Sequence, residues 1–234
     1  MGSEMCIRDR LEQCGYKLKK KSIKFLGMMV DDQLYWNEHV KYVENKLRKI
    51  IYSINQVKKI FPRKLCVTLF KSLLMPHIDY GLAIYGNAKK ISNITKLQKW
   101  GIRAATNSKY NAHTEPLYKI YNILKLDDLY KLKLYNLVRQ CVDDTAPDKM
   151  TDMFDYHLEK NRIKYYLTQR KPVSKVVDSL PYFKIPIEWN KAKFSDIFAT
   201  TKTFTNKHKK SVIDSYSFSC FIKKCYNCQP QTSQ

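Results

Sequence analysis

The stretch that decides the fold reads Ile23-Lys24-Phe25-Leu26-Gly27-Met28-Met29-Val30-Asp31-Asp32-Gln33-Leu34-Tyr35-Trp36-Asn37-Glu38-His39. Its apolar run, Phe25 to Val30, is interrupted by Gly27 and is typical of one or two short strands. The polar residues that follow, Asp31 to Gln33, predict a turn. The chain should therefore begin its folded part with a small β hairpin.

A helical period replaces the strand pattern after Trp36. Apolar residues recur there at steps of three and four through Val57, which predicts a long helix with one buried side. We expect Asn37 to cap this helix and Pro62 to force its end near Ile60.

Further apolar periods predict a mainly helical fold downstream, with a small N-terminal β hairpin and an irregular C-terminal extension. The second helix should pair with the first as a helical hairpin. The expected helices run from Pro62 to a stop at Pro76, from a Ser92 cap to Asn107, from near Pro116, from near Asp127, over Glu188–Phe198 and over Tyr216–Lys224.

The charge balance limits the functions that are open to this chain. Lys and Arg number 43 against 21 Asp and Glu, a formal net charge of +22 on 234 residues, and such an excess favours a polyanionic partner, above all nucleic acid. No window is apolar enough to span a membrane, and no small-molecule substrate is indicated. We expect an intracellular protein, nuclear or cytoplasmic.

The chain divides into four parts on pattern and composition. Residues 1–10 look like a translated adaptor or cloning remnant, residues 16–36 form the β segment, residues 37–150 form the helical domain, and residues 151–234 form a basic extension with a disordered end. A preceding palm is expected to be missing from this chain.

A series of landmarks appears in a fixed order after the opening stretch. They are Asp79-Tyr80-Gly81, Tyr85-Gly86-Asn87, Leu97-Gln98-Lys99, Ile102-Arg103, Ala112-His113-Thr114, Pro116-Leu117, and Leu124, Leu126 and Asp128. Together with the opening stretch they resemble the region that ends the palm and opens the thumb of reverse transcriptases from jockey-like non-LTR retrotransposons. The likeness covers about residues 22–145 and is weaker to 190. Tyr85 stands where the family usually has tryptophan.

This resemblance implies a role for Phe25, Leu26 and Gly27. In the family such a strand is similar to the primer grip, the hairpin that holds the 3′ end of the growing strand. Glycine would allow a nucleic-acid strand to approach the backbone closely. An ordinary buried strand with a bulge glycine is the alternative.

Asp31 and Asp32 look like a polymerase metal-binding pair, but we expect a turn. Two-metal phosphoryl transfer needs a further carboxylate on a neighbouring strand, and the resemblance puts the catalytic pair well before Phe25. We therefore assign no catalytic residue, no metal ligand and no cofactor to this chain, although a parent polymerase would need Mg²⁺.

The predicted first helix carries a polar stripe opposite its apolar one. It consists of Lys41, Asn45, Arg48, Tyr52, Asn55 and Lys59. Such a face is suited to following a phosphate backbone, and Lys41, Arg48, Tyr52 and Lys59 are the predicted nucleic-acid-binding residues. A solvated face that happens to be cationic is the alternative.

Other residues are given structural roles. Cys220, Cys225 and Cys228 with His208 could bind zinc, but their spacing is not that of a zinc knuckle, so thiols are favoured. Trp36, Tyr80, Tyr85 and Trp100 should be core aromatics.

The predicted function is that of a truncated reverse-transcriptase (RNA-directed DNA polymerase) fragment. It would hold an RNA/DNA duplex beside the missing palm and fingers of its parent polymerase and would be inactive alone. The alternative is a free-standing or domesticated nucleic-acid-binding module without enzymatic activity.

Overall fold

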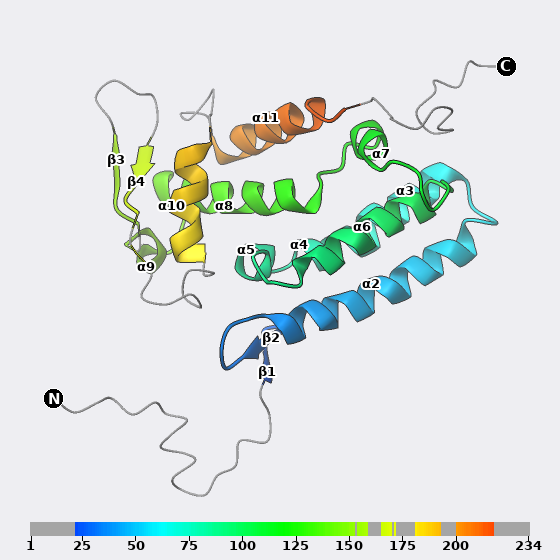
Figure 1. The fold of residues 1–234 in the computed structure, drawn as a ribbon. Helices are drawn as coiled ribbons and strands as arrows, with labels where there is room; N and C mark the ends of the chain where they lie inside the picture. The colour runs from blue at the N-terminus through cyan, green and yellow to red at the C-terminus, as the bar shows by residue number, and fades with distance from the viewer. Residues whose placement is uncertain are drawn as a thin grey trace, which may run out of the picture.

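The computed structural model describes residues 22–152, 154–158, 165–169, 171, 181–192 and 200–217. Within these residues the fold is mainly helical with a small N-terminal β hairpin, as predicted (Figure 1). The elements are β1 (Ser22–Phe25), β2 (Met28–Asp31), α2 (Asn37–Val57), α3 (Arg63–Leu69), the π-helix η1 (Phe70–Leu74), α4 (Met75–Asp79), α5 (Leu82–Tyr85), α6 (Ile91–Ala105), α7 (Glu115–Ile120), α8 (Leu126–Val142), α9 (Asp148–Thr151), β3 (Tyr156–Leu158), β4 (Tyr165–Leu167), α10 (Pro181–Lys191) and α11 (Thr201–Asp214).

The hairpin is an antiparallel pair in which Phe25 lies opposite Met28. Its two-residue turn is made by Leu26 and Gly27, with φ angles of 44° and 81°. Both positions of such a turn require a left-handed backbone, which glycine adopts without strain and leucine does not. The turn is therefore held by contacts from outside the hairpin, described below.

Helix α2 buries the apolar stripe that the sequence predicts, including Val40, Leu47 and Ile51, which are fully buried. The prediction that Asn37 caps this helix is wrong. Trp36 occupies the cap position with φ 61°, and Asn37 is the first helical residue. The left-handed backbone at Trp36 turns the chain from the strand into the helix, and Asp31 fixes that turn from a distance.

The predicted second helix continues through Pro76 instead of stopping there. Helix α3 passes into η1, and the Met75 amide then donates to the Phe70 carbonyl, five residues back. This wider turn precedes Pro76, whose nitrogen has no proton to donate, so the helix continues as α4 to Asp79. The expected pairing of this segment with α2 as a helical hairpin is confirmed.

The main core lies where α2, α6 and the α3–α4 segment pack on one another. Helix α6 lies along α2, and α8 lies across the other side of α6 (Figure 1). Helices α6, α7 and α8 begin close to their predicted positions. Ser92 is not the cap of α6, because Lys90 holds that position.

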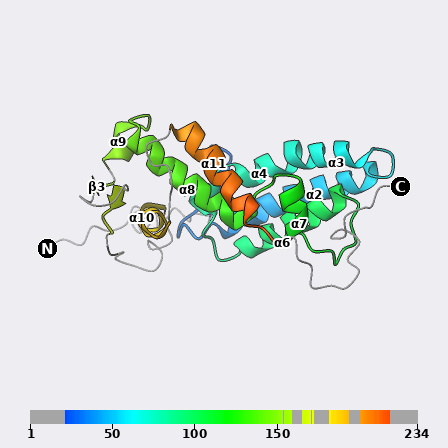
Figure 2. The ribbon, with the colours of Figure 1, turned by 90° about the horizontal axis from the view of Figure 1, so that it is seen from above.

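A second apolar cluster joins the C-terminal half of α8 to α10 and α11. Its centre is Trp189, which is fully buried, with Val138 and Phe204 beside it. Figure 2 shows α11 crossing over α8, and the two helices are in contact. Helix α8 thus contributes side chains to both clusters. The division of the chain near residue 150 remains a prediction.

The C-terminal helices differ from their predicted positions. Helix α10 runs over Pro181–Lys191 instead of Glu188–Phe198 and contains Pro186. Helix α11 was missed because only two of its residues, Phe204 and Ile213, are buried, which is too weak an apolar period to recognise. The predicted helix over Tyr216–Lys224 lies mostly outside the described residues, as do residues 1–21.

In the described part of the chain, no helix is both long enough and apolar enough to cross a membrane.

Candidate nucleic-acid interface

The hairpin turn is anchored by Tyr80, which follows α4. The Tyr80 hydroxyl donates a hydrogen bond to the carbonyl of Leu26. A Cβ on Gly27 would lie 3.4 Å from the Tyr80 ring, and one on Gly81 would lie 2.8 Å from Met28 Sδ. The Phe-Leu-Gly and Tyr-Gly landmarks, far apart in sequence, therefore pack directly on each other.

His39 attaches the second strand to α2. The Met29 amide donates to His39 Nδ1 at 3.2 Å, and the His39 ring meets the Tyr85 ring edge-on with 4.7 Å between centroids. Tyr85 in turn donates to the Ile78 carbonyl at 2.6 Å. Burial, with a smaller effect of Lys46, lowers the pKa of His39, which favours the neutral ring whose Nδ1 can accept the Met29 proton.

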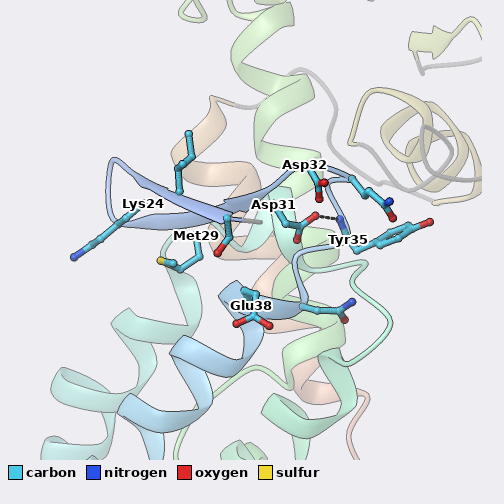
Figure 3. Close-up of a pocket in the computed structure, with 10 residues that line it drawn as sticks. Lys24, Met29, Asp31, Asp32, Tyr35 and Glu38 are labelled. Carbon is cyan, nitrogen blue, oxygen red and sulfur yellow. Dashed lines mark hydrogen bonds between the residues drawn. The ribbon is translucent and has the colours of Figure 1, made fainter. Parts of the chain in front are cut away.

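Asp31 fixes the start of α2. One carboxylate oxygen accepts the Tyr35 amide at 2.8 Å (Figure 3). The other accepts the Trp36 amide, also at 2.8 Å. Asp31 itself is the last residue of β2, and Asp32 and Gln33 form the predicted turn. Both oxygens of Asp31 therefore serve the backbone, which is a structural role.

A pocket of about 730 Å³ lies beside this turn. Asp31, Asp32 and Glu38 line it, with Lys24 at its edge (Figure 3). Three carboxylates against one lysine would repel a phosphate. Among the described residues, no group of three or more His, Cys, Asp or Glu side chains is arranged to hold a metal ion.

The predicted binding face of α2 lies on the surface. Lys41, Arg48 and Tyr52 are exposed on the side opposite the core, and Lys59 is exposed in the turn after the helix. Glu44 comes within 4.0 Å of the exposed Arg48, but its own side chain is only 15% exposed and also accepts a hydrogen bond from Asn93. The exposed face therefore stays cationic.

Sequence reasoning missed a cationic cluster that joins the hairpin to α2. Lys46 and Lys24 lie over the Tyr42 ring, at 4.6 and 5.8 Å from its centroid. A hydrogen bond from Lys46 is the main cause of a lowered pKa for Tyr42. The Tyr42–Lys46 spacing of one helical turn was visible in the sequence, but the approach of Lys24 required the fold.

The hairpin also carries exposed apolar side chains. Ile23 and Phe25 are each 62% exposed, and Leu26 is 74% exposed. A two-stranded hairpin with such a surface is rarely stable unless something covers it. The predicted site residues Phe25, Leu26 and Gly27 are thus accessible, and they lie at the end of α2 from which the cationic face runs.

Two more landmarks make polar contacts in the interior. Gln98 is fully buried; its Nε2 donates to the Leu124 carbonyl at 2.9 Å, and its Oε1 accepts the Leu126 amide at 3.0 Å. Arg103 Nε donates to the Ala112 carbonyl at 2.7 Å. These contacts fix α6 against the segments before α7 and α8.

The prediction of core aromatics is confirmed for Trp36 and Tyr85, which are buried, and wrong for two others. Tyr80 is 55% exposed because its hydroxyl reaches the hairpin turn, and Trp100 is 45% exposed on the outer side of α6. His208 packs between the Tyr135 and Phe204 rings. Cys220, Cys225 and Cys228 lie outside the described residues.

The chain that carries these ordered landmarks is similar in sequence to a reverse transcriptase of a jockey element. This relative is the RNA-directed DNA polymerase from mobile element jockey of Drosophila melanogaster, and the chain is 27% identical to it over 130 residues, 53% of the chain. The match covers 14% of that relative. No protein-family model matches the chain, and no solved structure matches it. The chain is thus a distant homologue of a small part of a retrotransposon polymerase.

Proposed function

We propose that this chain is the primer-grip and thumb part of a jockey-type reverse transcriptase. In this role the hairpin and the exposed face of α2 hold the primer and template strands. Catalysis belongs to a palm that lies outside this chain. The 27% identity to a jockey polymerase supports the family assignment. The exposed hairpin and the cationic face of α2 support the proposed contact surface.

The observation that carries the proposal is the continuity between the hairpin and the cationic helix. Tyr80 and His39 hold the hairpin against α4 and α2, so its apolar turn keeps a fixed position relative to Lys41 and Arg48. A rigid hairpin next to a row of positive side chains can engage a strand end and the phosphates that follow it.

The role of Asp31 supports a holding function over a catalytic one. Its two oxygens already accept two backbone amides that fix the start of α2, and a metal ion would compete with these hydrogen bonds. With Mg²⁺ and a primed RNA template, we expect the purified chain to extend no primer. Extension of the primer would refute the proposal.

The binding surface is tested by salt dependence. In the Lys41→Ala/Arg48→Ala/Lys59→Ala variant, the slope of log affinity for an RNA/DNA duplex against log salt should fall by about one per lost phosphate contact. The matched control is Lys96→Ala/Lys99→Ala/Lys109→Ala, which removes the same charge from exposed positions elsewhere. Equal losses in both variants would show attraction by net charge alone and would reject α2 as the interface.

The hairpin is tested with a recessed primer end. Phe25→Ser should weaken binding to a duplex with a recessed 3′ end more than binding to a blunt duplex, because only the former offers a 3′ end followed by an unpaired template strand. If Phe25→Ser leaves both affinities unchanged while the α2 variant loses duplex binding, a free-standing nucleic-acid-binding module is the better description.

A further inference from the structure

A second pocket, of about 420 Å³, lies away from the hairpin and its acidic pocket, with no lining residue in common with the latter. Its walls come from four places: η1 with α4, the segment after α7, α8, and α11. Helices α8 and α11, which both contribute lining residues, are in contact with each other (Figure 2). The pocket has the volume of a typical small-ligand site.

The floor of the pocket is apolar and rigid. Ile123, Leu124 and Leu132 are buried members of the main core, and Met75 and Leu129 pack against them. The Gln98 side chain ties the Leu124 backbone to α6 with a buried hydrogen bond. A flat apolar group could rest on this floor without displacing it.

The rim of the pocket is cationic. Lys71 comes from η1, Lys133 from α8 and Lys209 from α11, against the single carboxylate of Asp79, so three lysines and one aspartate give a formal charge of +2. Asp79 is already paired with Lys133 at 2.7 Å. In the described part of the chain, neither Lys71 nor Lys209 has a carboxylate partner.

The wall that carries Lys209 is fixed. The Thr205 hydroxyl donates to Asn136 Oδ1 at 2.8 Å, which joins α11 to α8 one turn before Lys209. The π-turn of η1 similarly interrupts the helix at Lys71, and such turns often occur at functional sites. The two unpaired lysines thus project from fixed backbones on either side of an apolar floor.

We propose that this pocket binds one unpaired nucleotide of a single-stranded nucleic acid, with its phosphate on Lys71 and Lys209 and its base on the apolar floor. Lysine is a common phosphate ligand, and the base supplies the flat apolar surface. A base inside a duplex is stacked and paired and cannot enter such a pocket. The inference therefore goes beyond the duplex-holding role of α2 and uses a different surface.

The test measures binding of a fluorescently labelled oligothymidylate to the full chain. Lys71→Ala/Lys209→Ala should weaken it by about tenfold or more, since hydrogen bonds to charged groups are lost. The matched control Lys131→Ala/Lys210→Ala removes two exposed lysines from α8 and α11 that do not line the pocket. Equal losses in the two variants would overturn the proposal.

Competitors then identify the ligand chemistry. Thymidine monophosphate should displace the probe better than either thymidine or inorganic phosphate; displacement by phosphate alone at the same concentration would mean that the floor plays no part and would refute the site. If the mononucleotide does not compete at all, the pocket does not accept a nucleotide and the proposal is wrong. An acidic peptide and an oligonucleotide of equal charge are then compared as competitors. If the peptide displaces the probe equally well, the pocket does not recognise a nucleotide and the proposal is wrong.

Two further variants separate this site from the rest of the molecule. Leu129→Trp places bulk in the pocket without changing charge and should weaken oligothymidylate binding, with thermal unfolding as the check on folding; unchanged binding by the folded variant would refute the pocket. The Lys41→Ala/Arg48→Ala/Lys59→Ala variant should retain thymidine monophosphate binding, so failure of the duplex proposal would leave this result unaffected.

Discussion

At the scale of single residues, His39 joins the hairpin to the helical core. It is 1% exposed and accepts the Met29 amide only while its ring is neutral. Burial, assisted by Lys46, lowers its pKa below the ordinary value of 6.5. The unfolded chain therefore takes up a proton at a higher pH than the folded chain does, and acid favours unfolding.

This gives a pH prediction with a defined sign. The contribution of His39 to stability should be complete above about pH 6.5 and should be lost as the pH falls below that value toward the folded-state pKa. In His39→Asn, an amide oxygen can still accept the Met29 proton but does not titrate. The free energy of unfolding, measured by urea titration from about pH 7.5 to pH 5, should fall less steeply for His39→Asn than for the unmodified chain.

The comparison between the two proteins isolates His39 from other histidines. Burial also lowers the pKa values of His77 and His208, and both remain in the variant. Parallel pH profiles for the two proteins would contradict the role given to His39.

At the scale of elements, the close approach of α6 to η1 depends on Gly101. A Cβ there would lie 2.8 Å from Leu74 Cδ1 and 3.0 Å from Phe70 Cε2, and both neighbours are fully buried. Alanine favours a helix by about 1 kcal/mol over glycine, but overpacking a core costs about 1–3 kcal/mol. Gly101→Ala should therefore lower the free energy of unfolding by about 1 kcal/mol despite the helical gain.

The matched control for this prediction is Lys96→Ala, an exposed position on the same helix, which should change stability by less than about 0.5 kcal/mol. Stabilisation by Gly101→Ala would show that α6 and η1 can separate without cost.

At the scale of the whole molecule, α8 determines whether the chain unfolds as one unit. Its Leu126 and Leu132 belong to the main core, and its Val138 and Cys141 belong to the C-terminal cluster around Trp189. Trp189→Ala should cost about 3–5 kcal/mol. Because α8 is shared, we expect this loss to destabilise both clusters together.

Removal of Trp189 also makes tryptophan fluorescence a probe of the first cluster. With Trp189 removed, Trp36 and Trp100 are the remaining tryptophans, so fluorescence reports on the first cluster while circular dichroism reports on all helices. The two transitions should coincide at a lower urea concentration than in the unmodified chain, with exposed Lys191→Ala as control. Separate transitions would instead support independent units divided near residue 150.

The sequence alone was enough to predict the helical class, the hairpin, the buried side of α2 and the cationic character of the chain. The elements follow from apolar periods among residues a few positions apart, and the charge follows from composition alone. The stop expected at Pro76 failed because η1 changes the hydrogen-bond register before the proline. The cap expected at Asn37 failed because the chain already turns into the helix at Trp36, where Asp31 accepts the Tyr35 and Trp36 amides.

What the sequence by itself determined was therefore the set of elements and the order of the landmarks. Only the tertiary structure decided that the landmarks are in contact, that Tyr80 is exposed and hydrogen-bonds to the Leu26 carbonyl, and that Lys71 and Lys209 line one pocket. The physical reason is distance along the chain. Tyr80 and Leu26 are 54 positions apart, and such a contact exists only once the helices between them have packed.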